Sequence, residues 1–189
     1  MSTGIIILIV LGVLLLILVG IYNRLVALRQ TCNQAFADVD VQLKQRHDLI
    51  PNLVETVKGY AAHERETLDA VIQARNQAVS ARGGVHAQAE AENILSGALG
   101  RLIAVAEAYP DLKANQNFQQ LMASLSDVEN KLAAARRFFN NAVGEYNTGI
   151  QQFPAVLFAG AMGFGAKEFF DVGEDKRATL DQAPSVKFS

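Results

Sequence analysis

The side chains whose spacing could hold a metal ion are two histidine–carboxylate pairs. His63-Glu64 resembles the start of an HExxH zinc site, in which two histidines four residues apart bind the ion. The fourth position after His63 is Thr67, so the second ligand is missing. His86 and Glu90 also stand four residues apart, but such a pair is far more often a solvated helix start than a metal site. We therefore expect no metal ligands and no cofactor.

The sequence also offers no clear nucleophile and no phosphate-binding loop. Cys32 is the single cysteine, so no intrachain disulfide is possible. A catalytic cysteine needs a nearby base, and the sequence around Cys32 supplies none, which favours a small buried apolar residue. Gly163-Phe164-Gly165 lacks the strand-to-helix context of a phosphate loop. We expect no catalytic residues and no enzymatic activity.

Charged residues on apolar helix faces are the more informative polar positions. Arg46 and Arg75 occupy such positions in the first half of the chain, and Glu129 lies on a later helix. Charges this close to a core are usually paired. We predict an interhelical network that joins Arg46 or Arg75 to Glu129. The alternative is that these long side chains extend along the core surface to water.

All of these residues follow an apolar segment at the N-terminus. Gly4 to Ile21 contains no charge, and all 17 basic and 19 acidic residues come after it. A helix of this length spans about 27 Å, close to the hydrocarbon thickness of a bilayer. Leu18 stands where a signal-peptide cleavage site requires a small residue. We predict an uncleaved transmembrane helix rather than a signal peptide.

The charges next to this segment predict its orientation. Arg24 and Arg29 flank its C-terminal side, and no Lys or Arg precedes it. By the positive-inside rule, the N-terminus is outside and the following domain is in the cytoplasm. The formal net charge of −2 provides no basic field for binding nucleic acid.

Apolar residues after Tyr22 recur at steps of three and four, which is the period of a helix. The first helix is expected to continue from the membrane segment to about residue 82. Pro51 either begins a new helix as a first-turn residue or kinks a continuous one, and the apolar spacing, which stays in phase through it, favours the kink. The second runs from about His86 to Tyr109, and the third from about Asn117 to Gln151. The apolar faces include Leu68, Val71, Ile72 and Val79 in the first helix and Ile94, Leu95, Leu99 and Leu102 in the second.

This pattern predicts an all-α fold, an antiparallel helical bundle of three to four helices on a single N-terminal transmembrane helix. The predicted organisation is a transmembrane anchor over residues 1–21 and a helical bundle over residues 22–153. A Gly/Ala/Phe-rich packing or interface segment follows over residues 154–170, and a polar C-terminal tail over residues 171–189.

Several motifs resemble the LemA family of bacterial membrane proteins. The most specific is the block Arg46-His47-Asp48-Leu49-Ile50-Pro51-Asn52-Leu53-Val54. Others are Tyr22-Asn23-Arg24-Leu25, Tyr109-Pro110-Asp111-Leu112-Lys113, Ala135-Arg136-Arg137 and Tyr146-Asn147. The resemblance covers the chain from the anchor to about residue 170. It implies a helical bundle on one anchor, with no established enzymatic activity and no catalytic residues to carry over.

The resemblance also points to a role in membrane organisation, because a family member of magnetosome-forming bacteria is implicated in shaping the magnetosome membrane. We expect a non-enzymatic, single-pass protein of the bacterial inner membrane. Its partners would be the lipid bilayer and further copies of itself, in a homo-oligomeric scaffold. The main alternative is a membrane-tethered adaptor or signalling module for an unidentified membrane protein partner. A metal hydrolase that uses His63 and His86 is the remaining alternative.

Overall fold

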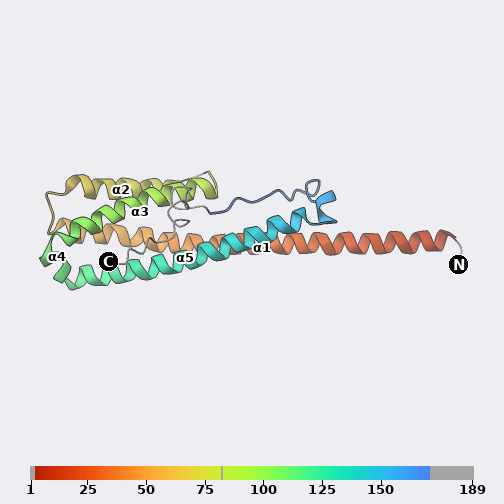
Figure 1. Cartoon of the computed structure of the whole chain (residues 1–189), viewed down its shortest axis with the longest axis horizontal. Helices are drawn as coiled ribbons and strands as arrows, with labels where there is room; N and C mark the ends of the chain where they lie inside the picture. The colour runs from red at the N-terminus through yellow and green to blue at the C-terminus, as the bar shows by residue number, and fades with distance from the viewer. Residues whose placement is uncertain (1–2, 82, 171–189) are drawn as a thin grey trace, which may run out of the picture. The chain divides into compact units, whose positions relative to one another are not determined.

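The computed structural model of the chain describes residues 3–81 and 83–170, which form helices and connecting turns (Figure 1). In chain order the helices are α1 (Thr3–Lys58), α2 (Arg65–Ser80), α3 (Val85–Glu107), α4 (Pro110–Ala114), α5 (Gln116–Gln151) and the 3₁₀ turn η1 (Ala155–Leu157). The predicted all-α fold with a long apolar N-terminal helix is confirmed. The predicted polar tail, residues 171–189, lies outside the described residues.

The chain forms two compact units, and both α1 and α5 contribute to each of them. The two-helix unit contains residues 3–41 and 133–168, which are the first part of α1, the last part of α5 and the segment after α5. The four-helix unit contains residues 42–132 and residues 169–170. Its helices are the rest of α1, the start of α5, and α2, α3 and α4.

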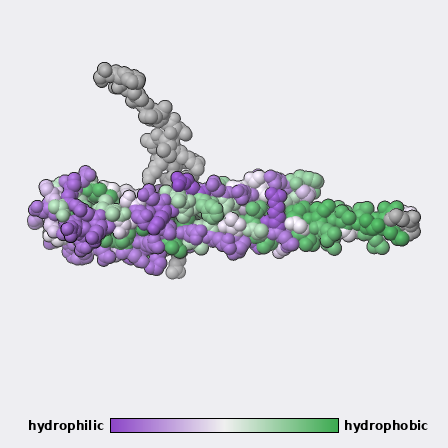
Figure 2. Space-filling view, turned by 90° about the horizontal axis from the view of Figure 1, so that it is seen from below, coloured by the Kyte–Doolittle hydropathy of each residue, from purple (hydrophilic) through white to green (hydrophobic). Residues whose placement is uncertain are grey.

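The N-terminal part of α1 is an apolar helix that packs against no other part of the chain. Its most apolar stretch is 0% buried, and among the described residues α1 alone contains a stretch long and apolar enough to cross a membrane. Figure 2 shows this end of the molecule covered by hydrophobic residues, drawn in green. A helix satisfies its own backbone hydrogen bonds, as a membrane-spanning segment must. The structure therefore indicates membrane anchoring at the predicted position.

α1 continues through Pro51 without interruption and ends at Lys58. Pro51 is exposed, so the proline ring faces water and does not disturb the core. The prediction that this helix reaches about residue 82 is wrong. Gly59 follows the helix end, and a turn closed by the bond from Ala61 N–H to Val57 C=O leads toward α2. The low helix propensity of glycine ended the helix here, although the apolar spacing on either side stays in phase.

In the two-helix unit, α1 and α5 run in opposite directions and pack closely. The rings of Phe36 and Phe139 lie 5.3 Å apart. Further along, Gly149 faces α1 so closely that an added Cβ would lie 2.8 Å from Cδ1 of Leu28. Moving from Phe36 to Leu28 on α1 thus corresponds to moving from Phe139 to Gly149 on α5. The contacts define an antiparallel pair whose C-terminal α5 end approaches the apolar part of α1.

The segment after α5 turns back and is bound to the same two helices. Tyr146 Oη donates to Gly165 O at 2.9 Å. Asn147 donates to Lys167 O and accepts from Lys167 N–H, each at 2.9 Å. The Lys167 ammonium donates to Asn33 Oδ1 of α1 at 3.1 Å. Gly163 has φ +77°, a left-handed conformation that glycine adopts without strain and that permits the return.

The four-helix unit has one continuous apolar core. α2 and α3 are connected by Gly83 and Gly84, both at positive φ, and they pack side by side in opposite directions (Figure 1). The buried side chains come from all of its helices, α4 included: Ile50, Leu53, Val57, Leu68, Val71, Ala74, Leu95, Leu99, Leu102, Leu112, Phe118 and Leu125.

Several residues predicted on apolar faces are exposed instead. Ile72, Val79 and Ile94 all point to water. Each follows or precedes a core residue by one position, which turns a helical side chain by about 100°. The buried stripe of α2 passes through Val71, Ala74 and Ala78, and the larger side chains of Ile72 and Val79 lie beside this stripe and face water.

The predicted polar connection after Pro110 also contains α4, because Pro110 begins this short helix at a position where its missing N–H has no cost.

We predict that Gly149→Leu destabilises the protein while Gly97→Leu does not. At Gly149 the new side chain must push α1 and α5 apart, with an expected loss of about 1–3 kcal/mol from overpacking. Gly97 has open space around it, so the same change there gains up to about 1 kcal/mol of helix propensity. Thermal unfolding of the full chain in detergent, followed by helical circular dichroism, measures both. Equal effects at the two sites would contradict the close α1–α5 contact.

Candidate functional site: a buried charge cluster

The candidate site is a group of charged side chains inside the four-helix unit, centred on Arg46 of α1. The Arg46 side chain is 2% exposed. Its Nη1 lies 2.6 Å from Glu92 Oε2 of α3, and its Nη2 donates to Ser96 Oγ at 2.8 Å. Its Nε lies 2.6 Å from Glu129 Oε1 of α5, as an ion contact without the alignment of a hydrogen bond. One guanidinium therefore connects three helices.

Glu92 is the acidic centre of the cluster, and both of its oxygens are engaged. Oε1 lies 2.7 Å from His47 Nε2 and accepts a bond of 3.1 Å from Gln88 Nε2, while Oε2 faces Arg46. Because an ionised carboxylate can only accept, His47 carries a proton on Nε2 in this arrangement. The side chain of Glu92 is 1% exposed, so every interaction that stabilises its charge comes from the protein.

Burial and charge act in opposite directions on the Glu92 carboxyl. Burial by itself raises the pKa of Glu92, because it removes the water that solvates the charged form. The hydrogen bond and charge of His47, followed by the charge and hydrogen bond of Arg46, lower the pKa by more than burial raises it. The net result is a pKa below the ordinary glutamate value, so Glu92 is ionised at neutral pH.

α2 holds the backbone on which this cluster is built. Arg75 Nε donates to the carbonyl oxygen of His47 at 2.9 Å. A helix-interior carbonyl has a second lone pair, and Arg75 uses it without breaking the helix. α2 is thereby bound to the same turn of α1 that carries Arg46. All four long helices of this unit take part in the cluster or its support.

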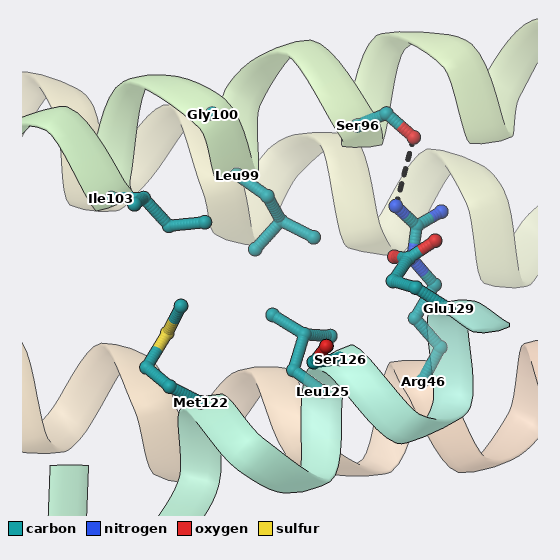
Figure 3. A pocket seen from close by; sticks show the side chains of 9 residues that line it. All are labelled: Arg46, Ser96, Leu99, Gly100, Ile103, Met122, Leu125, Ser126 and Glu129. Atoms are coloured by element: carbon teal, nitrogen blue, oxygen red, sulfur yellow. Dashed lines mark hydrogen bonds and ion pairs between the residues drawn. The ribbon is translucent and has the colours of Figure 1, made fainter. Parts of the chain in front are cut away.

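A pocket of about 360 Å³ opens beside the cluster, between α3 and α5 (Figure 3). Leu99 and Ile103 of α3 and Met122 and Leu125 of α5 point into it. Arg46, Ser96 and Glu129 form its polar end. The Glu129 side chain is 40% exposed, so it is the charged group of the cluster that is most accessible to a ligand.

Chemically, the cluster is suited to holding helices in place. A buried ion pair gains little net stability, because desolvation offsets most of the Coulomb attraction. Such pairs are directional, however, and a shift of one helix by one residue would leave a charge without a partner. The cluster therefore restricts α1, α3 and α5 to one alignment.

The predicted network is confirmed for Arg46, which meets Glu129, whereas Arg75 bonds to the carbonyl of His47 instead. His63 lies in the turn before α2, and His86 lies in the first turn of α3. Over residues 3–81 and 83–170, no three His, Cys, Asp or Glu side chains are grouped as metal ligands.

Cys32 is fully buried in the two-helix unit, as expected for a small apolar residue. It lies on α1 between the contacts made by Leu28 and Phe36. Burial raises the pKa of its thiol, and the nearby charge of Lys167 lowers the pKa by a smaller amount. The thiol is therefore in its neutral, poorly nucleophilic form at neutral pH.

Sequence reasoning missed His47 and Glu92, the two residues that complete the cluster. A signal for Glu92 was present, because extending the α3 stripe of Leu102, Leu99 and Leu95 back by three residues reaches it. His47 lies beside the stripe position of Arg46, and no spacing rule distinguishes a histidine that turns inward there from one that faces water.

Comparison with known proteins relates most of the chain to one family. The sequence profile of the LemA family matches residues 35–188. The chain is 26% identical over 174 residues to Magnetosome protein MamQ of Magnetospirillum gryphiswaldense, which covers 79% of this chain and 64% of that protein. Magnetosome protein MamQ 2 of Paramagnetospirillum magneticum gives the same identity and coverage. The chain thus spans less than two thirds of the length of these relatives.

A further relative matches over more of both chains. Protein LemA of Metamycoplasma hominis is 24% identical over 170 residues, which covers 90% of this chain and 78% of that protein. The profile match begins at residue 35, after the apolar part of α1, and includes Arg46, Glu92 and Glu129.

We predict that Glu92→Gln lowers stability by about 3 kcal/mol, because the Arg46 guanidinium stays buried without the counter-charge of Glu92. This corresponds to a decrease of about 6–12 °C in melting temperature for a chain of this size. Asp48→Asn is the matched control, since it removes one carboxylate from an exposed pair with Lys44. A shift as small as that of the control would contradict the structural role of the cluster.

We also predict that the difference in melting temperature between the wild type and Glu92→Gln becomes smaller at acid pH. The pKa of Glu92 is lowered in the folded state, so its contribution is present above the ordinary glutamate value of about 4.3 and is lost as pH falls below it. Melting temperatures of both proteins, measured from pH 7 down to about pH 3, should converge. A difference that stays constant over this range would show that the charge of Glu92 is not what stabilises the fold.

Proposed function

The chain belongs to the LemA family, and from this premise we propose that it is a non-enzymatic membrane scaffold that self-associates and thereby organises or shapes the bilayer. The proposed location is the bacterial inner membrane. Arg24 and Arg29 follow the apolar segment, which favours a cytoplasmic position for the rest of the chain and an external N-terminus.

The observation that carries the proposal is the continuity of α1. Its apolar part is not covered by protein, and the same helix continues to Lys58. Along the way it buries Leu25, Cys32 and Val39 within the two-helix unit. A contact between the soluble parts of two chains would therefore act directly on both membrane helices, with no linker between them.

Exposed apolar side chains on the helices support self-association. Val41 on α1 and Phe138 on α5 are each 52% exposed, and both belong to the two-helix unit. Single exposed apolar residues are common, but an aromatic ring is a frequent anchor of protein contacts. Closed symmetric assemblies form when such a patch matches itself on a second copy. We assign the self-association contact to Phe138.

The names of two relatives support this proposal. Both carry the name of a magnetosome protein, and the matched region includes the whole four-helix unit. A shared helical domain with an N-terminal membrane helix would suit a role in arranging membranes.

A second candidate function is that of a membrane-tethered adaptor. The observation that favours it is the apolar pocket between α3 and α5, with the partly exposed Glu129 at its polar end. A partner side chain that is apolar with a terminal positive charge would match this lining. In this case the chain itself would be monomeric and would bind a partner in a fixed ratio.

The mass of the full chain in mild detergent, from size-exclusion chromatography with light scattering, tests the scaffold proposal. We expect a discrete assembly of several copies, and a smaller assembly for Phe138→Ser. Val79→Ser is the matched control, because Val79 is similarly exposed but lies on α2 in the other unit. A detergent-bound monomer for the wild type would contradict self-association and favour the adaptor.

A further inference from the structure

The segment after α5 exposes large apolar side chains in the two-helix unit. Phe153 is 80% exposed and Leu157 is 71% exposed, and Val156 between them also faces water. Such a cluster is unusual on a water-facing surface, where neighbouring apolar side chains are normally covered. The cluster is continuous in sequence and lies around the turn η1, so it forms one apolar tip.

Contacts with α1 place this tip near the end of the apolar helix. The ring of Phe164, two residues after the tip segment of residues 153–162, meets the ring of Tyr22 edge-on, with centroids 5.6 Å apart. Tyr22 directly follows Ile21, the last residue of the uncharged run. The guanidinium of Arg29 lies 4.9 Å above the same Phe164 ring. Arg29 is eight residues beyond Ile21, or about 12 Å along a helix.

The antiparallel alignment of α1 and α5 gives the same level independently. Gly149 of α5 packs between Leu25 and Leu28 of α1. α5 ends at Gln151, two residues closer to the N-terminus of α1, so the end of α5 reaches about the level of Arg24 and the tip begins there. The polar zone of a bilayer is only about 5–8 Å thick on each side of the hydrocarbon. The exposed tip therefore lies at the height of that zone if α1 spans the membrane.

Hydrogen bonds prevent the tip from folding away. Its far end is fixed by the bonds from Tyr146 to Gly165 and between Asn147 and Lys167. Its near end is continuous with α5, which packs against α1. Because both ends of the tip are fixed, Phe153 and Leu157 stay exposed at one level along α1.

We propose that residues 153–162 are a second membrane contact, which inserts its apolar side chains into the leaflet next to the C-terminal end of the α1 span. The occupant of this surface is lipid, because the tip lies at the same level along α1 as the C-terminal end of the apolar segment. Aromatic and basic residues, Tyr22 and Arg29, border it on the water side, as they border membrane segments generally. The inference rests on the proposed anchoring of α1 and adds a one-sided contact with the same bilayer.

Single-tryptophan fluorescence can test this, because the natural chain contains no tryptophan. The full chain is reconstituted into phosphatidylethanolamine–phosphatidylglycerol vesicles, with and without lipids brominated in the acyl chain. Leu157→Trp reports on the tip, and Leu16→Trp reports on the α1 span, where the native side chain is also exposed. Val79→Trp on α2 is the matched water-exposed control.

We expect Leu157→Trp to emit at short wavelength and to be quenched by brominated lipid, by a smaller share than the deeper Leu16→Trp, while Val79→Trp is not quenched. Phe153→Trp should repeat the result at the other end of the tip. Long-wavelength, unquenched emission from both tip variants would overturn the proposal. Short-wavelength emission without quenching would overturn it as well, since the tip would then be covered by protein. Absence of quenching at Leu16→Trp would instead show that the anchoring of α1 itself is wrong.

Discussion

A guanidinium removed from water must meet its counter-charges where it lies, and Arg46 places this requirement on three helices at once. α3 contributes Glu92, which also contacts His47 of α1, and α5 contributes Glu129. Apolar stripes tolerate small sliding movements, because one leucine can replace another against the same surface. A buried charge does not tolerate them, since its partner must stay within hydrogen-bond distance. The hydrophobic core thus holds the four-helix unit together, while the charge cluster selects the alignment in which it packs.

The two-helix unit achieves its alignment by shape instead. Gly149 leaves room for Leu28, and the paired rings of Phe36 and Phe139 fix the distance along the helices. Polar bonds are placed at the edge, where Asn147 satisfies both the N–H and the C=O of Lys167. Alignment by shape in one unit and by charge in the other suits α1, which passes from the membrane into water. The part of α1 nearest the apolar run carries no buried ion that would have to be desolvated near lipid.

The helices and the membrane segment could be predicted from the sequence because both depend on long patterns. The apolar run of α1 and the stripe of α5 extend over many turns, so single exceptions do not obscure them. The end of α1 depended on one residue, Gly59, whose effect the continuing apolar spacing concealed. Ile72 and Val79 are exposed because the buried face of α2 is centred on Val71, Ala74 and Ala78, which turns both larger side chains away from the core. Arg46 was predictable from its stripe position, whereas His47 and Glu92 required the three-dimensional contact.

The buried thiol of Cys32 gives the α1–α5 contact a built-in reporter. Cys32 is the single cysteine of the chain and lies on α1 between the residues that meet Gly149 and Phe139. An alkylating reagent can reach its sulfur only while the two helices are transiently separated, and even then only the small thiolate fraction reacts. The rate of alkylation is therefore proportional to the opening equilibrium of that contact. Each modified molecule also records one opening event, because the added group cannot fit back between the closed helices.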